Sequence, residues 1–85
     1  MASEATYFVY VLRNDTGTTY TGIALDVEAR LTAHNAGTGA KFTRGRGPWI
    51  VIHTEGPLPL GDALRREMGI KKDRKFKASL QTSSC

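Results

Sequence analysis

An aromatic and β-branched run from Tyr7 to Leu12 (YFVYVL) constrains the fold of this chain more than any other segment. Residues of these types are enriched in buried β-strands. A cluster of turn-forming residues follows at Asn14 to Gly17, and Thr18 to Ile23 (TTYTGI) is again strand-prone. Two strands around a short polar turn predict an antiparallel hairpin.

Helix signals and glycine–proline breaks divide the rest of the chain. Asp26 is a candidate N-cap, and Gly37 a candidate stop, for a helix over Val27 to Asn35. The glycine-rich, basic segment from Gly37 to Pro48 predicts a loop or a short broken helix. Beyond it we expect, in order, a strand at Trp49 to Thr54, a break at Gly56 to Pro59, a helix from Leu60 or Asp62 to about Lys72, and a last short helix at Asp73 to Leu80.

This order of elements predicts an α+β domain, a small three-stranded antiparallel sheet flanked by helices in the order β-β-α-β-α-(α). A chain of 85 residues has room for one domain. We expect its core to span about residues 7–80, with frayed ends at Met1 to Thr6 and Gln81 to Cys85.

Composition argues against several classes of protein. No run of about 18 apolar residues is present, so no membrane span is expected. The first residues lack the basic start and apolar centre of a signal peptide, so we expect an intracellular, cytoplasmic protein. The only cysteine is Cys85, which predicts neither an internal disulfide nor a cysteine-rich zinc site.

The chain carries a net charge of +4, and most of its lysines and arginines lie in two segments, Lys41 to Arg46 and Arg65 to Lys77. Clustered positive charge attracts nucleic acid through counterion release and electrostatic steering. Charge alone is equally consistent with an ordinary soluble basic surface.

Glu67 breaks the apolar pattern of the second predicted helix. At 100° per residue one face of this helix holds four apolar side chains, and Glu67 falls among them. The four are Ala63, Leu64, Met68 and Ile70. A carboxylate there is costly unless it is paired, hydrogen-bonded or bound to a metal. The simpler alternative is an ion pair with Lys71, four residues on.

Four other side chains are candidates for a site. Arg30 and His34 lie one turn apart on the first predicted helix, where both could reach one phosphate. Tyr10 and Tyr20 lie on the two strands of the hairpin, which the turn brings side by side. The alternatives are a solvated helix edge for the first pair and ordinary packing for the tyrosines.

These residues resemble the motifs of the GIY-YIG endonuclease superfamily. Phe8-Val9-Tyr10 and Tyr20-Thr21-Gly22 resemble its two signatures, and the family's arginine, histidine and glutamate positions match Arg30, His34 and Glu67. The resemblance covers Tyr7 to Lys72 and is closest to the small stand-alone bacterial GIY-YIG proteins. Phe8 replaces the glycine that leads the first signature.

The resemblance implies an activity and a role for each side chain. The activity is metal-dependent cleavage of DNA, with Glu67 holding one Mg²⁺ or Mn²⁺ ion. Tyr20 would take a proton from the attacking water, and Tyr10 would position that water or share its proton. Arg30 would neutralise charge on the phosphate, and His34 would assist Tyr20 or contact a phosphate oxygen. We expect the DNA path to be lined by Lys41, Thr43, Arg44, Arg46 and Lys71.

The sequence therefore predicts a DNA endonuclease of low sequence specificity, or one directed by DNA structure, acting in repair or recombination. The expected substrate is branched, nicked or duplex DNA, and RNA stays open. A protein partner or a second copy of the chain could supply targeting. Two alternatives remain, a GIY-YIG domain that binds nucleic acid with little hydrolytic activity alone, and a small interaction module.

Overall fold

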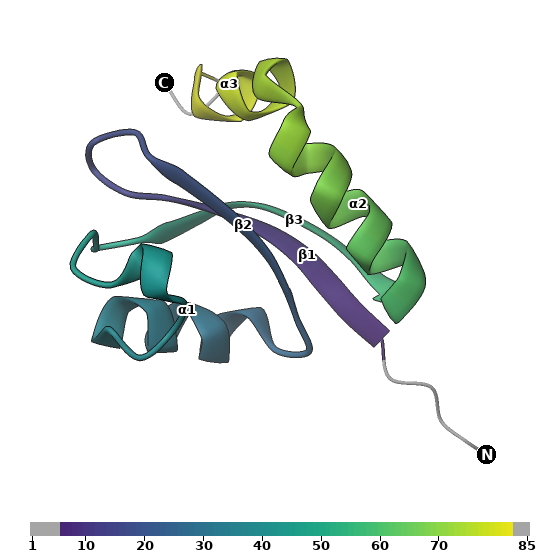
Figure 1. Cartoon of the computed structure of the whole chain (residues 1–85), viewed down its shortest axis with the longest axis horizontal. Coiled ribbons are helices and arrows are strands. Elements are labelled where there is room, and N and C mark those ends of the chain that lie inside the picture. Colours follow the sequence, from purple (N-terminus) through teal and green to yellow (C-terminus); the bar gives the residue numbers. More distant parts are fainter. Residues whose placement is uncertain (1–5, 83–85) are drawn as a thin grey trace.

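Three strands form one antiparallel sheet in the order β2-β1-β3, so the aromatic first strand lies at its centre (Figure 1). The strands are β1 (Thr6–Arg13), β2 (Thr19–Ala24) and β3 (Ile50–Pro59). The computed structural model describes residues 6–82, with side chains through residue 80. The expectations for Met1 to Ala5 and for Cys85 lie outside the described residues.

Three α-helices and one short 3-10 helix complete the chain, and the predicted order of elements is confirmed. They are α1 (Val27–Ala36), η1 (Lys41–Thr43), α2 (Leu60–Lys72) and α3 (Arg74–Thr82). α1 lies on one face of the sheet, and α2 lies on the other (Figure 1). Within residues 6–82, none of these helices is long and apolar enough to cross a membrane.

The ends of α1 follow the predicted signals. The Asp26 side chain accepts a hydrogen bond from the Ala29 backbone N–H over 3.1 Å, which satisfies one of the free amides of the first turn. Gly37 ends the helix in the left-handed conformation at φ 83°, where glycine has no steric cost.

Two expected boundaries are wrong by more than one residue. β3 continues through Gly56 and Pro57 to Pro59, where a break was predicted. Proline is tolerated here because β3 is an edge strand, and Gly56 takes φ 132° beside the Tyr7 backbone, at a shift in the strand register. α3 also extends to Thr82, so Gln81 is helical where a frayed end was expected.

β1 contributes buried side chains to both layers of the core because successive residues of a strand point to opposite faces. Val9 and Val11 pack with Ala63 and Ile70 of α2 on one face. On the other face Tyr10 and Leu12 pack with Ala24 and Trp49, against Val27 and Leu31 of α1. Tyr10 is therefore a core residue as well as a motif residue.

A charged cluster on β3 fastens α2 to the sheet. Glu55 on β3 accepts two hydrogen bonds from Arg66 of α2, over 2.7 Å and 2.8 Å, and His53 Nε2 lies 2.7 Å from the same carboxylate. The Arg66 guanidinium also lies over the Phe76 ring of α3. The hydrogen bonds from Arg66, helped by His53, lower the pKa of Glu55 to about 2 from its usual 4.5.

We expect Glu55→Gln to lower the free energy of unfolding by about 1–3 kcal/mol at pH 7, because charge-assisted hydrogen bonds are lost. Urea titration measures this difference. The depressed pKa of Glu55 means that the wild-type advantage is fully present above pH 4.5 and is lost as the pH falls towards 2.

Asp62→Asn is the matched control. It breaks an exposed ion pair with Arg65 on α2, and we expect a loss below about 0.5 kcal/mol. Equal losses in the two variants, or a Glu55 advantage that persists to pH 2, would contradict this account.

Candidate active site

A buried hydrogen bond between Tyr10 and His34 joins the central strand to α1. The Tyr10 hydroxyl lies 3.0 Å from His34 Nε2, and each residue is only 1% exposed. The second ring nitrogen, His34 Nδ1, lies 2.8 Å from Thr43 Oγ1 of η1. Thr43 Oγ1 in turn donates to the Ala40 carbonyl oxygen over 2.9 Å. Two predicted site residues, Tyr10 and His34, therefore meet in the core, and Thr43 bonds the other ring nitrogen of His34.

Tyr20 lies beside this hydrogen bond and is only partly buried. Its ring centroid is 5.0 Å from that of His34 and 6.4 Å from that of Tyr10. On η1 the Phe42 ring stacks with Tyr20 at 6.1 Å, and the Arg46 guanidinium lies 4.9 Å from the Phe42 centroid. The predicted meeting of the two tyrosines is present, and Tyr20 is the one nearer to solvent.

Arg30 lies one turn before His34 on α1 and affects the pKa values of both Tyr10 and His34. Burial raises the pKa of Tyr10, and the hydrogen-bonding capacity and positive charge of Arg30 oppose this rise. Burial also lowers the pKa of His34, and the charge of Arg30 lowers it further. We therefore expect a neutral imidazole and a protonated phenol near neutral pH.

Two glycines make this close packing possible. Gly22 pairs with Tyr10 across the hairpin, and a Cβ on Gly22 would lie 2.7 Å from the Tyr10 hydroxyl oxygen. A Cβ on Gly39 would overlap the His34 ring. The close approach of Tyr10 thus explains why the second signature has a glycine, Gly22, at this position. Gly39 allows the segment before η1 to cover the imidazole.

Glu67 lies on the buried side of α2, on the sheet face opposite α1. Its side chain is 16% exposed and lies in line with the buried Ala63 and Ile70. The predicted arc was wrong in part, because Leu64 and Met68 are 43% and 56% exposed. The seam that faces the sheet follows positions 63, 67 and 70, a spacing of four and three residues.

The structure gives Glu67 an ion-pair partner. Lys71 Nζ lies 3.2 Å from the carboxylate, which is the ion pair considered as an alternative. The negative charge of Glu67 also raises the pKa of Tyr10, as a smaller effect than burial. α2 packs against the edge strand β2 as well as β1. The carboxylate is therefore linked electrostatically to the tyrosine site from the other side of the sheet.

The potential metal ligands are few. The described part of the chain holds no group of three or more histidine, cysteine or acidic side chains that could together hold an ion. Mg²⁺ is commonly bound through one or two carboxylates, retained waters and substrate phosphates. Glu67 fits such a site as a single carboxylate, whereas a closed zinc site does not fit these residues.

The segment expected to line the DNA path divides into exposed and buried side chains. Lys41, Arg44 and Arg46 are exposed and basic. The expected DNA contact of Thr43 is wrong for this structure, because Thr43 is 0% exposed and its hydroxyl bonds His34 and Ala40. Lys71 is exposed but is paired with Glu67.

Sequence reasoning missed Phe42, Thr43 as a partner of His34, and Gly39. The signal for Phe42 was an aromatic residue inside a basic segment, a combination typical of surfaces that stack on bases. No sequence signal marked Thr43, because its partner lies nine residues away and the approach depends on the path of the loop.

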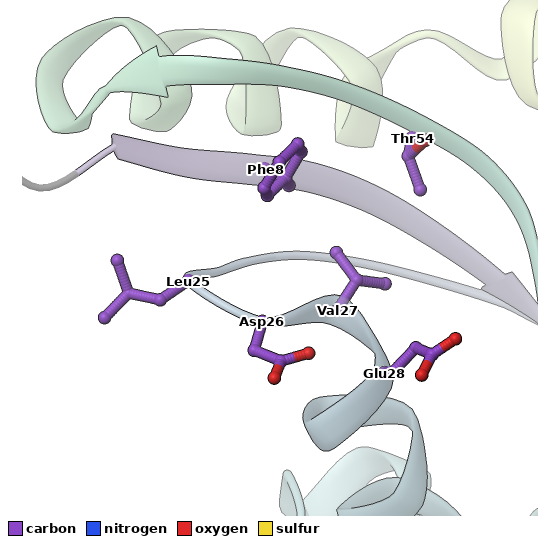
Figure 2. Close-up of a pocket in the computed structure, with 6 residues that line it drawn as sticks. All are labelled: Phe8, Leu25, Asp26, Val27, Glu28 and Thr54. Carbon is purple, nitrogen blue, oxygen red and sulfur yellow. The ribbon is translucent and has the colours of Figure 1, made fainter.

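A separate open cavity of about 360 Å³ lies beside the start of α1 (Figure 2). Phe8 and Val27 point into the space between β1 and α1, and the carboxylates of Asp26 and Glu28 lie at its rim (Figure 2). None of the predicted site residues lines it. Its two carboxylates repel phosphate, so it does not extend the candidate site.

Comparison with known proteins shows which family the chain belongs to. The model of the GIY-YIG catalytic domain matches residues 6–80. The UPF0213 protein VNG_2274C of Halobacterium salinarum is 48% identical over 66 residues, covering 78% of this chain and 86% of the relative. The UPF0213 protein SH2523 of Staphylococcus haemolyticus is 40% identical over 67 residues, covering 79% and 82%.

Two solved structures share the fold. The solution NMR structure of protein EF2693 from E. faecalis has a TM-score of 0.60 and 36% identity, covering 99% of this chain and 92% of the other. That of the UPF0213 protein BH0048 from Bacillus halodurans has a TM-score of 0.54 and 37% identity, covering 91% and 83%. The chain belongs to the GIY-YIG family, whose domain is typically that of a nuclease, and it is similar to the small UPF0213 proteins.

Proposed function

We propose that this protein is a metal-dependent DNA endonuclease that hydrolyses phosphodiester bonds with low sequence specificity or according to DNA structure. The observation that carries the proposal is the meeting of Tyr10, Tyr20 and His34, with Arg30 acting on the same phenol. Buried titratable side chains with shifted pKa values, such as Tyr10 and His34, are found more often at functional sites than elsewhere.

The side chains divide into accessible and supporting groups. Tyr20 and Arg30 are only partly buried, so they are available to substrate. Tyr10 and His34 are almost fully buried and lie behind them. Tyr20 would accept the proton of the attacking water, and Arg30 would neutralise charge on the phosphate. Tyr10 and His34 would hold this arrangement in place.

Glu67 would hold one Mg²⁺ or Mn²⁺ ion. When bound, such an ion polarises the phosphate and stabilises the negative charge that develops on the departing oxygen. Glu67 and the tyrosines approach from opposite faces of the sheet, and the edge strand β2 lies between them. Gly22 keeps this edge free of a side chain beside Tyr10.

Positive charge on η1 and the residues after it would bind the nucleic acid. Lys41, Arg44 and Arg46 would contact phosphates, which positions the strand without reading its sequence. The domain is small for a separate recognition surface, so we propose that a protein partner or a second copy directs it to its targets. We place its action in DNA repair or recombination in the cytoplasm.

A second candidate function is nucleic-acid binding with little hydrolysis by the domain alone. The ion pair between Glu67 and Lys71 favours it, because a carboxylate paired with an ammonium group is a weaker metal ligand. If DNA binding broke this ion pair, the Glu67 carboxylate would again be available to a metal ion. The two functions therefore differ in whether added Mg²⁺ or Mn²⁺ produces DNA cleavage.

We expect the purified protein to cleave DNA with Mg²⁺ or Mn²⁺ and not with EDTA, and Glu67→Ala to lower kcat by at least about 100-fold. Gel assays on branched, nicked and linear DNA measure cleavage. DNA affinity should change less than about threefold, because Glu67 lies on α2 and not in the basic segment from Lys41 to Arg46. Asp62→Asn on the same helix is the control and should cleave normally. Equal cleavage by wild type and Glu67→Ala would show that another protein is responsible.

We expect Arg44→Gln to weaken DNA binding uniformly across sequences and to lower the slope of log affinity against log salt by about one. Fluorescence anisotropy over a series of salt concentrations measures the slope. Arg74→Gln, which removes the same charge from α3, is the matched control. If Arg74→Gln lowers the slope as much as Arg44→Gln does, the DNA path lies elsewhere.

A further inference from the structure

The hydroxyl of Thr43 can make its two hydrogen bonds in only one direction. A carbonyl oxygen only accepts hydrogen bonds and a hydroxyl has one proton, so the Thr43 proton points at the Ala40 carbonyl, 2.9 Å away. The hydroxyl oxygen is then an acceptor for His34 Nδ1, at 2.8 Å. Making both bonds requires His34 to carry its ring proton on Nδ1.

This assignment also sets the direction of the bond to Tyr10. A neutral imidazole has one N–H, so His34 Nε2 is an acceptor and the Tyr10 hydroxyl donates to it over 3.0 Å. The Tyr10 oxygen then keeps its lone pairs free to accept a further hydrogen bond. Every donor and acceptor from the Ala40 carbonyl to the Tyr10 hydroxyl is then matched.

We propose that Thr43 is a positioning residue that selects the Nδ1–H tautomer of His34 and thereby orients the Tyr10 hydroxyl as the donor to that ring. In the other tautomer Nε2–H would donate to Tyr10, and the Tyr10 hydroxyl would have to donate to another group. The second ring nitrogen sets the tautomer in the same way at many histidine sites. The catalytic consequence rests on the proposed function, but the tautomer does not.

Thr43 is the hydrogen-bond partner of His34 Nδ1, and its surroundings hold it there. Thr43 is 0% exposed, so solvent does not replace its hydroxyl. Its carbonyl oxygen accepts from Trp49 Nε1 over 3.2 Å, which fixes the backbone of η1. Gly39 packs directly on the imidazole ring. The segment before β3 thus holds the hydroxyl in place by contacts that involve no substrate.

Nitrogen-15 NMR of the histidine rings tests the proposal without any enzyme assay, because protonated and unprotonated ring nitrogens have distinct shifts. The chain has two histidines, so a His53→Gln variant assigns the signals. We expect the wild-type protein to carry the His34 proton on Nδ1. Thr43→Val, which replaces the hydroxyl by a methyl group, should shift the tautomer ratio towards Nε2–H by about fivefold to tenfold, the effect of one hydrogen bond.

Two variants serve as controls. Thr43→Ser keeps the hydroxyl and should restore the wild-type tautomer. Thr32→Val removes an exposed hydroxyl of α1 that donates to the Glu28 carbonyl, and it should leave the ring unchanged. In DNA cleavage, Thr43→Val should lower kcat about tenfold with KM within about twofold, and Thr43→Ser should recover most of the loss.

The outcomes separate this proposal from the proposed function. A wild-type proton on Nε2, or an unchanged tautomer in Thr43→Val, overturns the role of Thr43 whether or not the protein cleaves DNA. The expected tautomer shift in a protein that never cleaves DNA supports the role of Thr43 and contradicts the nuclease. If Thr43→Val does not fold, the spectra of the wild type and Thr43→Ser still decide the tautomer.

Discussion

The hydrogen bond between Tyr10 and His34 is the interaction on which the rest of the candidate site depends. It joins the central strand to α1 within the core and places two polar side chains where apolar ones would pack. A buried polar group that loses its hydrogen-bond partner costs about 1–3 kcal/mol of stability. The second ring nitrogen of His34 bonds Thr43, so the same imidazole also holds η1 to the site. The same buried hydrogen bonds therefore stabilise the core and fix the geometry of the candidate site.

This arrangement separates the groups that meet substrate from the groups that hold them. Tyr20 and Arg30 are partly exposed, while Tyr10 and His34 are buried, and Thr43 bonds His34. Hydrogen-bond donors that are already oriented need not reorganise during a reaction, and this is a large part of electrostatic catalysis. In a domain this small, the side chains that orient the candidate site are also residues of the core.

Much of the fold was predictable from local pattern. The aromatic run of β1, the cap at Asp26 and the stop at Gly37 each act through neighbouring residues, and the structure has these elements with small changes at their ends. The extension of β3 through Pro57 was not predictable, because it depends on that strand lying at the sheet edge.

The candidate site was predictable only in part. The spacing of motifs named Tyr10, Tyr20, Arg30, His34 and Glu67, and the structure joins the first four on one face of the sheet. Contacts between residues far apart in the sequence, which motif spacing does not specify, set the remaining details of the site. They buried Thr43 against His34, stacked Phe42 on Tyr20, and turned Glu67 rather than Leu64 towards the sheet.

The central claim is that side chains from both faces of the sheet act on one phosphate at the edge strand β2. A crystal structure of the Tyr20→Phe variant with a short DNA and Mn²⁺, located by its anomalous scattering, tests it most directly. The account predicts one Mn²⁺ ion at the Glu67 carboxylate, with a DNA phosphate bound between that ion and Arg30. An ion bound away from Glu67, or DNA lying along α3, would contradict it.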